Sequence, residues 1–265
     1  MIVPNLKPYW IIASRKLLNL FNTLSPEYVL VPFPKEGEKL LLSYITNEIT
    51  YEELLNSMIS IDPLYTILSK QYVNMWPLVN VIKRVYQKMA FKVLCYNSLS
   101  SIRTELMSFM DLISLVMITR ISNRLKFDKL LRILSHHIDN YKNKLKGLVE
   151  EFMKKFFIFE GSWLMISDFS GRHLALELKG LGIKRVRLIY ITPYIFTPLE
   201  RLIREYAHGS LSEELARELI RAHADFLWNY VLLSNDINEA YLKWLREKHN
   251  REYLALVSRL YSQYV

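Results

Sequence analysis

Cysteine and glycine are scarce in this chain of 265 residues, and each scarcity excludes a class of structure. The single cysteine, Cys95, excludes an internal disulfide framework and any metal site built from several cysteines. Only seven glycines are present, which disfavours a fold rich in tight turns and favours helices.

Long apolar runs are also missing from the sequence. The most apolar window, Leu112–Thr119, is far shorter than the roughly 20 residues that cross a bilayer. Met1–Pro8 contains two prolines and no long apolar run, so no secretory signal is expected. The sequence therefore predicts a cytoplasmic protein with no membrane partner.

Basic charge is present in excess and is unevenly placed. The net charge is +9, and residues 120–155 hold 10 basic and 4 acidic side chains, a net +6. Such a stretch is typical either of a solvated helix face or of a surface that binds nucleic acid or an acidic partner. Under the second interpretation, the residues expected to contact phosphate are Arg120, Arg124, Lys126, Lys142, Lys144 and Lys146. The few glutamines and many Ile, Lys and Arg residues also resemble the composition of thermophilic proteins.

Short apolar runs alternate with amphipathic segments, which predicts a single α/β domain over residues 1–265. The expected strands are Tyr9–Ser14, Tyr28–Phe33, Phe91–Tyr96, Trp163–Ser167 and Lys184–Ile191. Tyr28–Phe33 is continuously apolar, as in a strand buried on both faces, and Pro32 predicts that it ends there or lies at an edge. Cys95 is expected to be a buried inert thiol. We expect a small, mostly parallel Rossmann-like sheet of about four or five strands.

Helices are predicted from capping residues and from three- and four-residue apolar spacing. Thr50 with Glu53 forms a capping-box pattern, and Thr197 is expected to cap another helix. Residues 100–157 are predicted to form a large helical insertion, and residues 210–265 a C-terminal helical hairpin.

His136 and His137 are adjacent on the predicted helical insertion. Neighbouring side chains on a helix point about 100° apart, and no further histidine or cysteine lies at a ligating offset. We therefore expect no metal site there, but a partly buried His137 beside an exposed His136.

The segment Gly161–Thr192 supports two structures that imply different functions. If Arg172–Gly180 is a strand, then Asp168, Glu177 and Lys179 match the spacing of the PD-(D/E)XK nucleases. Two carboxylates would bind Mg²⁺ and the lysine would position the attacking water. This chemistry requires the last two residues on one face, which a strand provides.

A helix over the same residues is the favoured interpretation. Leu174 and Leu178 fit one helix face, and Ser170 is a suitable N-cap. Gly180 and Gly182 are well placed to end a helix. The segment would then be a β-α-β unit, and the nuclease-like spacing would place its residues on an ordinary solvated helix surface.

With a helix there, the chain resembles the TraB/ChaN/erythromycin-esterase-like superfamily, also called the Tiki group, from about Trp10 to about Tyr206. The family's second strand and following helices are similar to SPEYVLVPFPKEGEKLLLSYITNEITYEELL, and the strand before its helical insertion is similar to KMAFKVLCYNSL. Its Arg-x-x-x-Ala helix is similar to SGRHLALEL, and the end of its last core strand to KRVRLIYITPY. The resemblance implies the fold and, for Arg172, a polar role at a site.

The metal and catalytic motifs of that family are not retained. Its first strand ends in Gly-Glu-x-His, whereas residues 13–15 are Ala-Ser-Arg. Its second strand ends in Glu, whereas residues 32–34 are Pro-Phe-Pro, and its final Gly-x-x-His is replaced by Thr-Pro-Tyr at residues 192–194. Metal binding and hydrolysis of the family type therefore have no visible means.

We therefore expect a non-catalytic α/β protein that binds a small ligand or a partner at the carboxyl ends of its strands. The expected binding residues are Ser14, Lys35, Asn97, Asp168, Arg172, Thr192 and Tyr194, although solvation or helix capping explains each equally well. One alternative is the Mg²⁺-dependent nuclease, and another is a basic nucleic-acid-binding accessory protein. No cofactor is predicted apart from Mg²⁺ under the nuclease alternative.

Overall fold

The computed structural model describes residues 2–4, 10–62, 77–158, 161–167, 170–183, 185–190, 195–235, 237–251 and 253–254. The chain divides into two compact units. The sheet unit comprises Met1–Arg103 and Lys144–Thr192, and the helical unit comprises Thr104–Asn143 and Pro193–Val265. Across the described part of the chain, no helix combines the length and the apolar character needed to cross a membrane.

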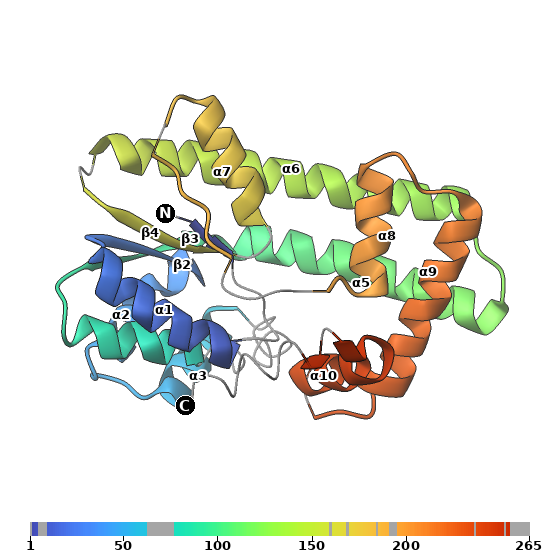
Figure 1. Ribbon diagram of the computed structural model, residues 1–265, viewed down its shortest axis with the longest axis horizontal. Coiled ribbons are helices and arrows are strands. Elements are labelled where there is room, and N and C mark those ends of the chain that lie inside the picture. Colours follow the sequence, from blue (N-terminus) through green and yellow to red (C-terminus); the bar gives the residue numbers. More distant parts are fainter. Residues whose placement is uncertain are drawn as a thin grey trace. The chain divides into compact units, whose positions relative to one another are not determined.

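A small parallel sheet forms the centre of the sheet unit (Figure 1). Its strand order is β1-β4-β2-β3, and each of these pairings is parallel. The strands are β1 (Ile2–Pro4), β2 (Tyr28–Pro34), β3 (Lys92–Asn97) and β4 (Trp163–Ser167). The predicted α/β class with a small parallel sheet is confirmed, and the chain has more helix than predicted.

Helices cover both faces of this sheet. Figure 1 shows α1 (Trp10–Leu24), α2 (Glu38–Ile45) and α3 (Tyr51–Ile61) on one face. The other face packs against α6 (Phe127–Ile158) and α7 (Ser170–Gly180), through a core that includes the side chains of Leu30, Leu148, Phe152, Trp163, Met165, Leu174 and Leu178. The predicted capping box at the start of α3 is confirmed, because Thr50 and Glu53 exchange both hydrogen bonds.

The strand β2 lies between β4 and β3 and is buried along almost its whole length. Continuous burial confirms the expectation from its unbroken apolar sequence. Pro32 does not end the strand, which runs to Pro34, but it lies beyond Leu30, the last residue of β2 that pairs with β4. The register with β3 shifts between Val31 and Pro34, and such an irregularity tolerates a residue that has no N–H group.

Two of the expected strands are not strands. Trp10–Ser14 belongs to α1, because a short apolar run fits a buried helix as well as a strand. In the region of Lys184–Ile191, the described residues 185–190 contain one isolated bridge residue, Leu188. Val186 and Leu188 pack against the core of the sheet unit. The alternating apolar pattern of this segment therefore arises from burial of one side and not from a continuous strand.

The helical unit joins parts of α5 (Leu99–Ser122) and α6 to the C-terminal helices. These are α8 (Pro198–Ala207), α9 (Glu213–Phe226), the π-helix η3 (Leu227–Val231) and α10 (Ile237–Lys248). Its main core contains Leu112, Leu115, Val116, Leu130, Leu134, Leu199, Leu202, Leu219 and Ile220. The helices α5 and α6 occupy the region predicted to be helical, and Thr197 caps α8 as predicted.

His223 is buried within this helical unit, one turn before the π-helix. Its side chain is 3% exposed, and its ring lies 5.7 Å from that of Phe226, which also contacts Trp244. Neither ring nitrogen has a hydrogen-bond partner among the residues that the structure describes. Burial disfavours the charged imidazolium and lowers the pKa of His223 to about 4.

We expect this histidine to make the protein less stable in mild acid. The unfolded chain takes up the proton near pH 6.5, whereas the folded chain resists it down to about pH 4. Stability attributable to this position is therefore intact above pH 6.5 and falls by about 3 kcal/mol as the pH is lowered to 4. Denaturant unfolding between pH 4 and pH 7 measures this fall.

Carboxylates elsewhere in a protein also titrate in this pH range. The variant His223→Leu therefore isolates the part of the pH dependence of unfolding free energy that comes from His223. The difference in unfolding free energy between the parent and this variant is expected to change by about 3 kcal/mol over the interval. The variant His136→Leu, at an exposed position on α6, is the matched control. Parallel pH profiles for the parent and His223→Leu would contradict the prediction.

Candidate functional site

The segment with two interpretations forms the helix α7, Ser170–Gly180. Leu174, Ala175 and Leu178 are buried at helical spacing, and Gly182 follows with a φ of +89°. The N–H of Gly182 donates to the carbonyl of Lys179, and the N–H of Ile183 donates to that of Leu178. This pair of bonds is a Schellman motif, in which glycine avoids the strain of a positive φ. The predicted helix and its glycine stop are confirmed.

The nuclease alternative needs a strand at this place, and the helix does not provide one. Residues two apart on a helix point about 200° apart, so Glu177 and Lys179 do not share a face. Both side chains are exposed on α7. Asp168, the first member of the proposed triad, lies outside the described residues.

The predicted binding residues have separate locations. Asn97 ends β3 and donates from Nδ2 to the carbonyl of Pro32, a contact that ties the ends of two strands together. Arg172 is exposed near the start of α7. Ser14 belongs to α1 and not to a strand end, because the expected first strand is helical. Asp168, Thr192 and Tyr194 lie outside the described residues, as does the side chain of Ser14.

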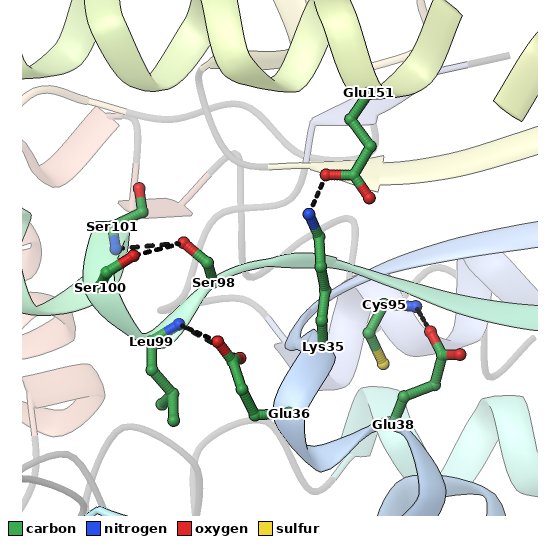
Figure 2. Close-up of polar contacts among 9 residues, drawn as sticks. All are labelled: Lys35, Glu36, Glu38, Cys95, Ser98, Leu99, Ser100, Ser101 and Glu151. Atoms are coloured by element: carbon green, nitrogen blue, oxygen red, sulfur yellow. Dashed lines mark hydrogen bonds and ion pairs between the residues drawn. The ribbon is translucent and has the colours of Figure 1, made fainter. Parts of the chain in front are cut away.

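A cluster of polar groups gathers at the carboxyl ends of β2 and β3 (Figure 2). Parallel strands end at the same edge of a sheet, which brings the turn after β2 beside the turn after β3. The first turn is the 3-10 helix η2, Lys35–Gly37, and the second leads into α5. Charged residues of this turn and of the start of α2 reach three different elements.

Lys35 pairs with Glu151 of α6. Figure 2 shows its side chain extending toward that helix. Glu151 also borders a small hollow between the sheet and α6, lined otherwise by Leu30, Tyr96, Leu148, Phe152 and Met165. The Lys35 side chain is 38% exposed, so it is only partly covered by this contact.

Glu36 reaches the first turn of α5. Both of its carboxylate oxygens lie 3.2 Å from the N–H of Leu99. Ser98 caps the same helix, since its Oγ accepts from the N–H of Ser101 and lies 3.1 Å from Oγ of Ser100. The first turn of a helix favours negative charge, and here the chain's own carboxylate supplies it.

Glu38 reaches in the opposite direction, toward β3. Its Oε2 accepts a 2.6 Å hydrogen bond from the N–H of Cys95, whose thiol is buried, as expected. β3 is an edge strand of the sheet, so its outward N–H groups need acceptors that the sheet does not supply. The Glu38 carboxylate is such an acceptor.

Gly37 fixes the direction of this turn. It is buried, and a Cβ at this position would meet side-chain atoms of Met58 and Phe33. A larger residue at this position would therefore require the side chains of Met58 and Phe33 to shift. The packing at Gly37 sets where the flanking carboxylates of Glu36 and Glu38 can reach.

The basic residues proposed for nucleic acid do not form one stripe. Lys142 and Lys146 are exposed and one turn apart on α6, whereas Lys144 is half-buried and points about 160° from both. Arg120, Arg124 and Lys126 are exposed around the end of α5. Among them, Arg120 forms an ion pair with Asp225 of α9, at 3.2 Å.

No group of three or more His, Cys, Asp or Glu side chains is placed to hold a metal ion within the described ranges. His137 is half-buried, with Nδ1 2.9 Å from Oγ of Ser108, and His136 is exposed beside it. This is the arrangement expected for adjacent helical histidines.

Sequence reasoning missed the acidic and hydroxyl members of the cluster, which are Glu36, Glu38, Ser98, Ser100, Ser101 and Glu151. A signal was present for Ser98, because serine directly before a helix is a preferred N-cap. The glutamates carried no such signal, since their partners lie 57 or more residues away along the chain.

We expect Glu38→Ala to destabilise the protein by about 2 kcal/mol, because a hydrogen bond to a charged acceptor is lost. Glu38→Gln keeps a carbonyl acceptor and is expected to lose about half as much. Denaturant unfolding measures both values, with Glu177→Ala as the control at an exposed carboxylate. Equal stability of Glu38→Ala and Glu177→Ala would refute a role for the Cys95 contact.

Comparison with known proteins gives no match to this chain, whether with protein families, curated proteins or solved structures. The resemblance to the TraB/ChaN-like superfamily therefore stays a prediction. The chemistry of the site is argued from the contacts of this chain alone.

Proposed function

We propose that this protein binds a small anionic ligand, a carboxylate or a phosphate, at the carboxyl edge of its sheet. The ligand would lie between η2 and the first turn of α5, the two turns that carry Lys35, Glu36 and Ser98. The proposal is one of binding and assigns no reaction to the site.

The observation that carries this proposal is the carboxylate of Glu36 at the start of α5. Its two oxygens share the N–H of Leu99 at 3.2 Å, a long and divided contact. A ligand carboxylate or phosphate offers the same oxygen chemistry without the geometric restraint of the Glu36 side chain. Glu36 is exposed, so it can leave this position for solvent when a ligand takes its place.

Lys35 supplies the cation that would favour an external anion. It follows β2 directly, and its partly exposed ammonium pairs with Glu151. A bound anion between Lys35 and the α5 start would receive a charge-assisted bond from the ammonium and a backbone bond from the helix. The hydroxyls of Ser98 and Ser100, which lie 3.1 Å apart at the start of α5, would add donors.

The position in the fold agrees with this assignment. Ligands of open parallel sheets bind beyond the carboxyl ends of the strands, where the connections leave on opposite faces. The chain leaves β2 toward α2 on one face and leaves β4 toward α7 on the other. β2 and β4 are neighbours in the sheet, so η2, which follows β2, lies where the two connections leave toward opposite faces.

Isothermal titration with inorganic phosphate and with a panel of small carboxylic acids tests the proposal. We expect at least one of these anions to bind, and Lys35→Met to weaken that binding about tenfold through loss of a charge-assisted bond. Glu36→Gln is expected to strengthen binding, because the competing internal carboxylate is removed. Lys39→Met, at an exposed lysine of α2, is the matched control and is expected to bind as the parent does.

Two results would contradict the proposal. One is equal affinity of Lys35→Met and Lys39→Met for an anion that binds the parent. The other is weaker binding by Glu36→Gln, which would make Glu36 a ligand contact and not a competitor. A conserved far-ultraviolet circular dichroism spectrum in each variant shows that the fold is unchanged.

A further inference from the structure

The helix α5 carries apolar side chains on two opposite faces. One face, with Leu112, Leu115 and Val116, is buried in the core of the helical unit. The other face exposes four large apolar side chains, Met107 at 58%, Met110 at 50%, Ile118 at 53% and Ile121 at 83%. A helix that is apolar all round is normally covered on every side, and a contiguous exposed apolar patch marks an interaction surface.

The exposed side chains are arranged symmetrically about Ser114, and together with it they are called the α5 stripe. Met107 and Ile121 each lie seven residues from Ser114, and Met110 and Ile118 each lie four residues from it. All four point within about 40° of the direction of Ser114. Reversing the direction of the helix therefore reproduces the pattern of the stripe.

The charges around the α5 stripe indicate what covers it. Between Arg103 and Arg120, α5 has two charged residues, of which Glu105 points away from the stripe and Asp111 lies at its rim. Arg103 bonds Asp62 at 2.9 Å, and Arg120 pairs with Asp225. The centre of the stripe is thus uncharged, and the basic groups at its ends already have acidic partners in the same chain.

An uncharged apolar stripe is matched best by a second stripe of the same kind. Homodimer interfaces are more apolar than other interfaces and are depleted in charge at their centre. A charged partner surface would lose hydration here without gaining a counter-charge. These features select a second copy of this chain as the occupant.

An antiparallel arrangement fits the stripe better than a parallel one. Parallel helices in register would place Asp111 beside Asp111 of the other copy, and like charges at one height repel. In the antiparallel arrangement these carboxylates are about 9 Å apart along the axis, and each Met107 meets an Ile121. The small side chain of Ser114 lies at the centre, where the two helices approach most closely.

We propose that α5 is a self-association surface, and that two copies of this chain pair through antiparallel α5 stripes about a two-fold axis at Ser114. Such an interface is isologous, since each side presents the same patch. The stripe covers 15 residues from Met107 to Ile121, about 21 Å of helix, which is at the small end of specific interfaces. We expect dissociation constants in the micromolar range.

Cysteine cross-linking tests the direction of pairing. The native Cys95 is buried, so cysteines introduced in the α5 stripe are the ones that react. Ser114→Cys is expected to form covalent dimers by itself. Met107→Cys and Ile121→Cys are each expected to cross-link weakly alone and efficiently when mixed. Efficient cross-linking of Met107→Cys alone would overturn the antiparallel arrangement.

Sedimentation velocity over a range of concentrations tests association itself. Ile121→Lys is expected to weaken dimerisation at least tenfold, because a charge is placed in the apolar contact. Leu176→Lys is the matched control, since Leu176 of α7 is 57% exposed but lies outside the stripe. A parent protein that stays monomeric at all concentrations, or equal weakening by both variants, would overturn the proposal.

Discussion

Burial of β2 on both faces is the constraint on which the rest of the sheet unit depends. This strand lies between β4 and β3, with helices on either side of the sheet, and has no room for a charged side chain. Polar chemistry from this part of the chain can therefore begin only where the strand ends. It begins at once, with Lys35, Glu36 and Glu38 within the next four residues.

These three charges also explain how the turn after β2 is held. Glu36 and Glu38 accept from backbone N–H groups of α5 and β3, and Lys35 pairs with α6. A carboxylate that accepts from a backbone N–H offsets part of its own desolvation, so such contacts stabilise more than surface ion pairs do. The same contacts that position the turn also bring it close to the first turn of α5, through Glu36, and to α6, through Lys35.

Local features of this fold could be predicted from sequence, and features that depend on distant partners could not. The caps at Thr50 and Thr197 and the glycine stop after α7 depend on residues within about six positions of one another, so their patterns are readable. The predicted strand Tyr9–Ser14 falls largely within α1, because a short apolar run is too short to show either helical or strand periodicity. Nothing local distinguishes Glu38 from any other glutamate, because its partner lies 57 residues away.

The helix α5 shows that apolar periodicity alone does not reveal which faces of a helix are buried. Its apolar residues occupy two faces, so they give no single stripe, and the sequence marks it only as a helix within an insertion. The structure separates the faces, because Leu112, Leu115 and Val116 lie in the core and the α5 stripe does not. Intramolecular packing thus accounts for half of the apolar pattern. The remaining apolar residues are uncharged at the centre of their face, which is the composition that homodimer interfaces favour.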